Sequence, residues 1–386
     1  MEGGPFSGSE TYFNSIANGV PLFSFPSPFL PSGTAATQNV SGVNPNLRTP
    51  YTQEWNLTIE RQLGSLGLRV SYLGSRSVNL IYRRNLNEPA PSTTPFSTSL
   101  FPNQLFSSIT YADNGGNESY NALELEAQKR IGRNLTFNTG FTWAKDLTDT
   151  QDDGGGGTTY GGQVLQNQFC RACEYSNSEV VPARRFYAYA VYALPFGQGH
   201  RFLSGAHGVV QAVLGGWQTG WTAVLQSGAY FTPAFSGSDP SNTGVIGGVP
   251  DLVPGVALYP ANQTVSNWFN PAAFRVPGCP AANPLCQDPK ITPANVGRFG
   301  DSGFNYLVGP PLRNLDFQLS KQFRIRERAT LQFTLLMTDA FNHPNFTEPS
   351  ANISAPATVG VISGTTAAIW GDPSSRDIDV VLRLMF

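Results

Sequence analysis

The segment Arg376-Asp-Ile-Asp-Val-Val-Leu-Arg-Leu-Met-Phe386 closes the sequence and decides the fold. In an extended strand, successive side chains point to opposite faces, so every second residue shares a face. About ten residues of tilted strand are enough to cross the apolar band of a bilayer. The segment therefore predicts either a membrane-crossing strand or an ordinary amphipathic edge strand. One of its faces is wholly apolar and comprises Ile378, Val380, Leu382, Leu384 and Phe386.

The charged residues of this segment fall on the opposite face, where Arg383 follows Asp377 and Asp379. An arginine on the lipid face near the membrane midplane would cost about 2–4 kcal/mol. The alternation turns Arg383 away from that face, so the register is compatible with lipid contact.

Composition favours one large β-architecture over two globular domains. The 386 residues include 40 glycines and 30 prolines, and only 13% are charged, against about 25% in typical soluble domains.

The net charge of -2 provides no basic field for nucleic acid. No run of about 18 apolar residues predicts a transmembrane helix. The first residues, Met1 to Phe6, lack the features of a signal peptide, so we expect any export signal to lie outside this sequence.

Strand-like segments recur with connections that alternate between short and long. The short connections lie near Gln62, Ile131, Pro195 and Arg324, and the others are long. Outer-membrane barrels have this arrangement, with short periplasmic turns and long extracellular loops. The sequence therefore predicts an all-β fold, an antiparallel transmembrane β-barrel. The predicted strands are 52–61, 67–73, 119–130, 134–145, 184–194, 216–227, 313–323, 329–341 and 376–386.

The number of predicted strands indicates a partial barrel. If Phe386 ends on the periplasmic side, counting the predicted strands back from it places the start of the first strand on the extracellular side. A barrel that is delivered from the periplasm cannot begin on that side. An open sheet edge in lipid would also leave backbone groups unpaired. Either a strand lies within residues 1–50, or the chain supplies about nine or ten strands of a larger barrel. We expect residues 1–50 to be an extracellular loop or a remnant of the upstream barrel, and residues 51–386 to be the C-terminal barrel part.

Aromatic residues recur near the predicted strand ends, as an interfacial girdle requires. The predicted girdle consists of Trp55, Tyr72, Trp143, Trp217 and Phe341.

The cysteines fall in two pairs within Gly-, Pro- and Asn-rich segments: Cys170 with Cys173, and Cys279 with Cys286. No histidine follows at zinc-finger spacing, which favours loop disulfides in an oxidising compartment over a metal site. The connectivity stays open at this stage.

We find no catalytic, cofactor or metal constellation, and we expect no enzyme activity. The histidines lie in predicted turns, and Asp149, Asp152 and Asp153 do not match a calcium-binding EF-hand loop. Glu124 and Glu126 alternate on one strand face, which is more typical of a solvated or lumenal wall than of paired catalytic carboxylates.

Several motifs together resemble the C-terminal half of TonB-dependent receptors of the Oar-like group, whose N-terminal domain is carboxypeptidase-regulatory-like. The quoted stretches span residues 44 to 386 and include Val70-Ser-Tyr-Leu-Gly-Ser-Arg76, Phe141-Thr-Trp-Ala-Lys145, Asn267-Trp-Phe-Asn-Pro-Ala-Ala-Phe274, Ala340-Phe-Asn-His-Pro-Asn-Phe346 and the closing strand.

The resemblance implies a roughly 22-stranded plugged barrel that takes up scarce nutrients by coupling to the TonB complex. It also implies a closing strand read by the barrel-assembly machinery, a wall in contact with outer-membrane lipid, and an unknown extracellular ligand bound by the long loops. Because the sequence contains neither a plug nor a TonB box, coupling to TonB would require a missing N-terminal region. The expected location is the outer membrane of a Gram-negative bacterium.

Three functions follow as hypotheses. The first is a receptor or transporter barrel that binds an extracellular ligand. The alternative is a structural or adhesive surface barrel without transport. A secreted soluble hydrolase fits worst, because no catalytic constellation supports it.

Overall fold

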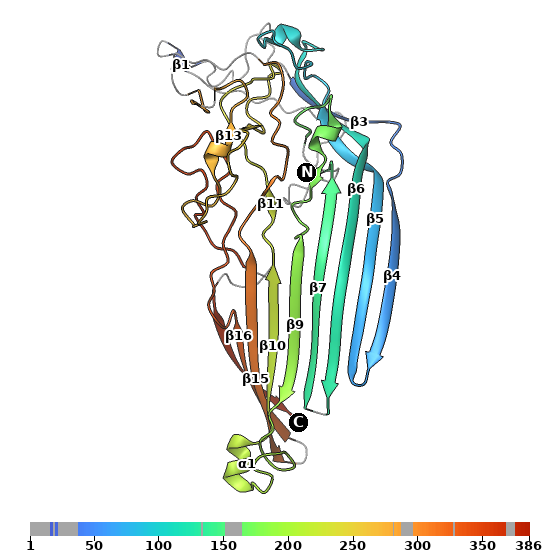
Figure 1. Ribbon diagram of the computed structural model, residues 1–386, viewed down its shortest axis with the longest axis vertical. Helices are drawn as coiled ribbons and strands as arrows, with labels where there is room; N and C mark the ends of the chain where they lie inside the picture. Colours follow the sequence, from blue (N-terminus) through green and yellow to red (C-terminus); the bar gives the residue numbers. More distant parts are fainter. Residues whose placement is uncertain are drawn as a thin grey trace.

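A curved antiparallel sheet dominates the computed structural model, which describes residues 16–17, 20–21, 38–132, 134–150, 164–280, 282–286, 296–326, 329–367 and 375–386 (Figure 1). The strands follow the order β17-β16-β15-β10-β9-β7-β6-β5-β4 across the sheet. They are β4 (Tyr51–Leu63), β5 (Leu66–Asn85), β6 (Phe106–Ile131), β7 (Leu135–Thr148), β9 (Arg184–Ala193), β10 (Trp217–Gln226), β15 (Leu312–Arg326), β16 (Ala329–Thr338) and β17 (Asp377–Met385).

Shorter elements decorate this sheet and its loops. β3 pairs in parallel with β6 and β8 pairs with β7, while β1 with β2, β11 with β14 and β12 with β13 form separate two-stranded sheets. Their bounds are β1 (Ile16–Ala17), β2 (Val20–Pro21), β3 (Gln38–Val43), β8 (Ser176–Asn177), β11 (Tyr230–Phe231), β12 (Asp251–Leu252), β13 (Phe274–Arg275), β14 (Leu307–Val308), α1 (Gly208–Leu214), and the 3-10 helices η1 (Thr98–Leu100), η2 (Arg171–Glu174) and η3 (Pro271–Ala273).

The connections β4–β5, β6–β7, β9–β10 and β15–β16 leave one end of the sheet, and the connections between the other neighbouring strands leave the opposite end. Figure 1 shows the short turns, α1 and the C-terminus at the bottom, and the long loops at the top. The predicted side of each connection is confirmed, and three of the four connections predicted to be short are tight turns, whereas the fourth, 194–216, is as long as the connection 86–105. The bottom end corresponds to the periplasmic side of an outer-membrane barrel, and the top end to the outside.

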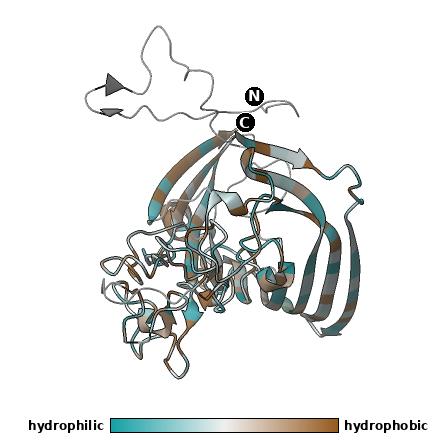
Figure 2. Ribbon diagram, turned by 90° about the horizontal axis from the view of Figure 1, so that it is seen from above, coloured by the Kyte–Doolittle hydropathy of each residue, from teal (hydrophilic) through white to brown (hydrophobic). Residues whose placement is uncertain are grey.

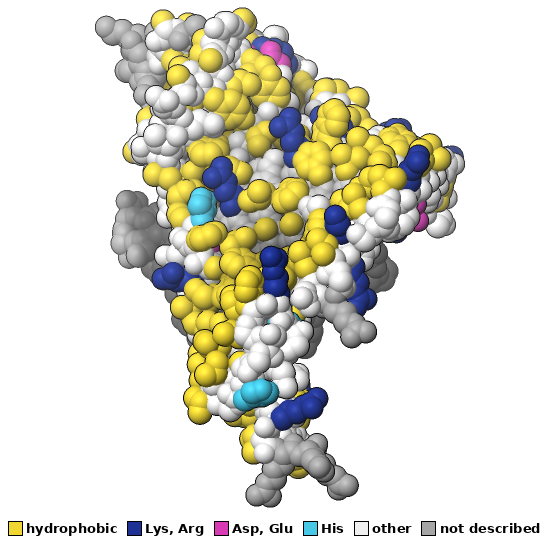
Figure 3. All heavy atoms as spheres, turned by 60° about the horizontal axis from the view of Figure 1, so that its bottom comes forward, with side chains coloured by type: hydrophobic (Ala, Val, Ile, Leu, Met, Phe, Trp, Pro, Cys, Tyr) yellow, Lys and Arg dark blue, Asp and Glu magenta, His cyan; other side chains and the backbone are white. Residues whose placement is uncertain are grey.

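The strand register gives the sheet one apolar face and one polar face. Leu57, Tyr72, Leu123 and Trp143 are successive cross-strand partners, so they share the apolar face. These apolar side chains are exposed, and Leu57 is 65% exposed. Such exposure of apolar side chains is favourable in lipid and unfavourable in water. Figure 2 shows the alternation of hydrophilic and hydrophobic residues along the strands, and Figure 3 shows a face where hydrophobic side chains gather and few charges are acidic.

The closing strand extends the apolar face as the sequence predicts. β17 pairs with β16 so that Ile378, Val380, Leu382 and Leu384 lie opposite apolar residues of β16. Arg383 lies opposite Gln332, on the polar face. The C-terminal segment 376–386 therefore forms a strand of the main sheet, and its apolar residues lie on the face that lipid can contact.

The sheet is an open arc in the described part of the chain, as seen from above (Figure 2). β4 and β17 lie at its two edges and do not pair with each other. This is the architecture of a partial barrel, which confirms the predicted fold class.

The structure adds to or differs from the sequence-based expectations in three places. The Pro- and Ser-rich stretch 84–118 separates two predicted strands and is expected to be a loop, but it is strand from Phe106 onward, because β5 and β6 continue their pairing beyond the apolar band, where polar side chains are solvated. The segment before residue 51 contains β3, so a strand does lie within residues 1–50, one of the two possibilities that the sequence leaves open. The connection after β9, predicted to be short, spans residues 194–216 and contains the helix α1, whose valines and leucine are exposed.

The long loops form a packed layer that we call the loop cap, comprising the described residues of 228–311 and 339–367. Phe269 is fully buried at its centre, and its ring contacts those of Phe231 and Phe274 at centroid distances of 5.7 and 5.9 Å. The sequence predicts an irregular segment here, and the segment is irregular yet has its own hydrophobic core. The core residues are Phe231, Phe235, Phe269, Ala273, Phe274, Val276, Cys279, Leu307 and Ile353.

Candidate functional site: the polar wall and the loop cap

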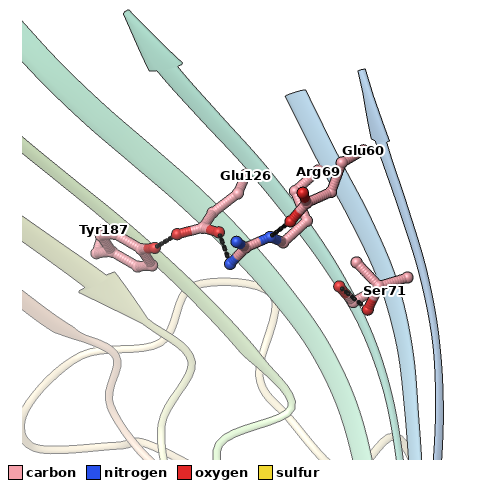
Figure 4. Close-up of polar contacts among 6 residues, drawn as sticks. Glu60, Arg69, Ser71, Glu126 and Tyr187 are labelled. Carbon is pink, nitrogen blue, oxygen red and sulfur yellow. Dashed lines mark hydrogen bonds and ion pairs between the residues drawn. The ribbon is translucent and has the colours of Figure 1, made fainter. Parts of the chain in front are cut away.

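A chain of polar contacts crosses the polar face of the sheet (Figure 4). Arg69 Nε lies 2.7 Å from Glu60 Oε1, and Arg69 Nη1 lies 2.9 Å from Glu126 Oε2. The hydroxyl of Tyr187 donates to Glu126 Oε1 at 2.7 Å. The contacts join four strands, β4, β5, β6 and β9, through groups that water would solvate in a lumen. Because the Arg69 and Glu60 side chains are about half exposed, water screens their ion pair, and it adds little to stability.

This chain of contacts answers two questions that the sequence leaves open. Glu126 is engaged by Arg69 and Tyr187, so it acts as a structural residue of the wall. The register of β9, ambiguous because both faces are aromatic, places Phe186 opposite Phe141 on the apolar face and Tyr187 on the polar face.

Buried polar contacts hold the loop cap in shape. Arg298 binds Asp251 through both guanidinium nitrogens, at 2.7 and 2.8 Å, and the Asp251 side chain is only 2% exposed. Asn177 and Asn305 each donate a side-chain amide to the backbone carbonyl of the other, at 3.0 and 2.7 Å. The contact between Asn177 and Asn305 ties the cap to β8, which pairs with the last two residues of β7.

A cavity of about 410 Å³ lies between the cap and the extensions of β5 and β6, and it is lined by two carboxylates. Glu88 is 2% exposed, and its Oε1 has no partner among the described residues. Glu174 Oε1 accepts the backbone amides of Gln166 and Asn167 at 2.9 and 3.3 Å. A buried carboxylate oxygen without a donor favours a ligand that supplies one. The lining residues are Asn85, Glu88, Ser108, Thr110, Val164, Leu165, Gln166, Glu174, Val245, Gly248 and Phe304.

Burial raises the pKa of both carboxyl groups. Desolvation raises the pKa of Glu88 to about 8, a hydrogen bond with Thr243 acts in the opposite direction, and the charges of Asp239 and Glu174 raise it further. Desolvation likewise raises the pKa of Glu174 to about 7, against the hydrogen bonds from Asn167 and Gln166. Near neutral pH the cavity is therefore poised to gain or lose protons.

We predict that the loop cap is less stable in alkali because of Glu88. The folded protein holds the Glu88 proton more tightly than an unfolded chain with a pKa near 4.5. The stabilisation is therefore complete below about pH 4.5 and is lost as pH rises through about pH 8. Amide hydrogen exchange around the cavity, corrected for intrinsic rates, should show weaker protection at pH 9 than at pH 5.

The variant Glu88→Gln should remove the part of this pH dependence that is due to Glu88, because glutamine mimics the protonated acid, and should leave the smaller part that is due to Glu174. Glu124→Gln on the polar wall is the matched control and should leave the dependence unchanged. If the Glu88→Gln protein showed the same pH dependence as the wild type, Glu88 would not be the group that weakens the cap in alkali.

The cysteines and the acidic loop residues lie at the long-loop end. Cys170 is bonded to Cys173 and Cys279 to Cys286, and Cys279 belongs to the cap core. Asp149 lies 2.9 Å from Arg171 and is a structural ion-pair partner. Residues 152 and 153 lie outside the described part of the chain, and the described residues contain no group of His, Cys, Asp and Glu suited to a metal ion.

The predicted girdle residues lie at different heights. Trp143 and Tyr72 are exposed on the apolar face toward the outer rim, and the indole of Trp55 covers Gly74 of the neighbouring strand. Trp217 lies at the opposite rim, where its Nε1 donates to the carbonyl of Val213 in α1. Phe341 follows the end of β16 and is 77% exposed. Whether these residues act as a girdle stays a prediction.

Sequence reasoning missed Glu88 and Glu174. Both lie in segments without period, and their burial depends on contacts with residues more than 70 positions away, such as the bond from Gln168 to the Glu88 carbonyl. A glutamate in an irregular segment carries no signal that distinguishes a buried acid from a solvated one.

An apolar outward face, a polar inner face and a one-sided loop cap define the wall of an outer-membrane β-barrel. The chain matches the family model of the outer membrane beta barrel domain over residues 2–378, and it belongs to that family. The protein accordingly resides in the outer membrane.

Solved structures similar to this chain are outer-membrane and metal transporters. They are the outer membrane transporter YddB from Escherichia coli (TM-score 0.45, 10% identity, covering 90% of this chain and 34% of that one), the FrpB iron transporter from Neisseria meningitidis, F3-3 variant (0.38, 10%, 90% and 33%), and the copper transporter OprC (0.35, 8%, 88% and 31%). The chain spans about a third of the length of each. A comparison with curated proteins gave no match.

Among the described residues, no helix has the length and apolar character needed to cross a membrane.

Proposed function

We propose that this chain forms the wall and loop cap of an outer-membrane receptor of the Oar-like TonB-dependent group. In the intact protein, the cap binds an extracellular ligand and the TonB complex energises its uptake. The proposal includes no catalytic step.

The cavity beneath the loop cap is the observation that carries this proposal. Long loops that served only to cover a barrel would not need a buried core, the Arg298–Asp251 ion pair and a cavity lined by Glu88 and Glu174. A preformed cavity with a few convergent polar groups is the usual form of a small-ligand site. Its carboxyl groups favour a ligand that donates hydrogen bonds or carries positive charge.

Uptake measurements test the proposal in cells that express the intact receptor. We expect mass spectrometry of the medium to show depletion of one or more solutes by wild-type cells, and not by cells that lack either the receptor or TonB. Replacement of Glu88 and Glu174 by alanine should abolish that depletion while the barrel still reaches the outer membrane. Binding that persists without TonB-dependent depletion would favour the adhesive alternative and contradict uptake.

A further inference from the structure

A second cavity, of about 620 Å³, lies on the apolar face of the sheet at the outer rim. Tyr72, Leu123, Trp143 and Arg184 form one cross-strand row over β5, β6, β7 and β9, so they all face the lipid side. Tyr230 of β11 and Val308 of β14, both in the loop cap, line the cavity as well. The cavity is therefore a groove between the lipid-facing wall and the loop cap, outside the lumen and separate from the Glu88 cavity.

Two cationic side chains border this groove above an apolar floor. Lys145 lies two residues beyond Trp143, on the same face of β7, and Arg184 is the cross-strand partner of Trp143. Both side chains are exposed, and neither forms an ion pair with a described residue. Within the described part of the chain, the hydrogen-bond partner of Lys145 Nζ is a neutral group, the side-chain oxygen of Asn177, at 2.5 Å. Charged groups left unpaired at the edge of an apolar band attract an anionic partner.

The groove also provides neutral polar groups near the two cations. Asn121 and Ser227 line it, and Tyr72 donates its hydroxyl to Asn121 Oδ1 at 2.7 Å. None of the described residues that line the groove is acidic. The floor comprises exposed aromatic and aliphatic side chains, with Trp143 60% exposed and Leu123 37% exposed. The site therefore matches a molecule that has phosphate at one end and acyl chains at the other.

We propose that this groove binds a phosphorylated glycolipid of the outer leaflet, whose phosphate is held by Lys145 and Arg184 and whose acyl chains lie along Trp143 and Leu123. The outer leaflet is the source because the groove adjoins the long loops, at the end of the sheet opposite the short turns. This proposal goes beyond ligand uptake and does not depend on it.

Lipid binding to the full chain, purified from outer membranes and freed of lipid in detergent, tests the proposal. Native mass spectrometry should detect a complex with diphosphoryl lipid A. The double variant Lys145→Gln/Arg184→Gln should weaken that binding by roughly thirtyfold, the combined effect of two cations near a lipid headgroup. The charge-conserving variant Lys145→Arg/Arg184→Lys should retain it, which separates loss of charge from misfolding.

The matched control is Arg61→Gln/Lys129→Gln, which removes one arginine and one lysine from the same face at the opposite rim. This variant should bind lipid A as the wild type does. The proposal is overturned if the wild type binds dephosphorylated lipid A or phosphatidylglycerol as well as it binds diphosphoryl lipid A. It is also overturned if Lys145→Gln/Arg184→Gln and the control variant lose the same affinity for lipid A.

Discussion

Replacing Phe269 with alanine should destabilise the loop cap by about 3–5 kcal/mol, the usual cost of removing a fully buried phenylalanine. The side chain is 0% exposed, and its ring packs edge-on against Phe231 and Phe274. The neighbouring indole of Trp268 bonds the carbonyl of Val308, so the loss should spread to β14. Limited proteolysis on intact cells should then cleave the cap much faster.

The control for this variant is Phe341→Ala, which removes the same atoms from a side chain that is 77% exposed. We expect an effect within about 0.5 kcal/mol for that change. Equal protease sensitivity of the two variants would mean that the cap has no core of its own.

Replacing Phe141 with arginine should severely impair assembly into the outer membrane. Phe141 lies in the middle of β7 on the apolar face, between Leu125 and Phe186. An arginine facing lipid near the midplane costs about 2–4 kcal/mol. The assembled fraction, measured by heat-modifiable migration on gels, should fall accordingly.

The neighbouring change Thr142→Arg tests the same strand on its other face. Thr142 lies opposite Glu124, on the polar side, so the new charge remains hydrated. Its assembled fraction should remain close to that of the wild type. If Thr142→Arg were as harmful as Phe141→Arg, the assignment of faces would be wrong.

The wall could be predicted from the sequence because lipid imposes a period of two on every strand that contacts it. Each predicted strand corresponds to one strand of the sheet, and the polar placement of Arg383 follows from alternation alone. The extension of β6 up to Phe106 was missed because that part lies beyond the lipid, where no alternation is required.

The loop cap and the Glu88 cavity could not be predicted, for a different reason. Their residues are brought together by contacts between distant loops, such as the Arg298–Asp251 pair, and no local pattern specifies those contacts. The packed core around Phe269 likewise combines residues from both long loops. Composition indicates a loop there without indicating that the loop is folded.

Single-cysteine accessibility along β16 tests the central claim, that this sheet is a lipid-facing wall with a polar inner face. Cysteines at Leu331, Phe333 and Leu335 should resist a water-soluble maleimide and report contact with quenchers in the lipid acyl chains. Cysteines at Gln332, Thr334 and Leu336, on the opposite face, should react with the maleimide and escape the quenchers. Uniform reactivity along the strand, without a period of two, would contradict the account.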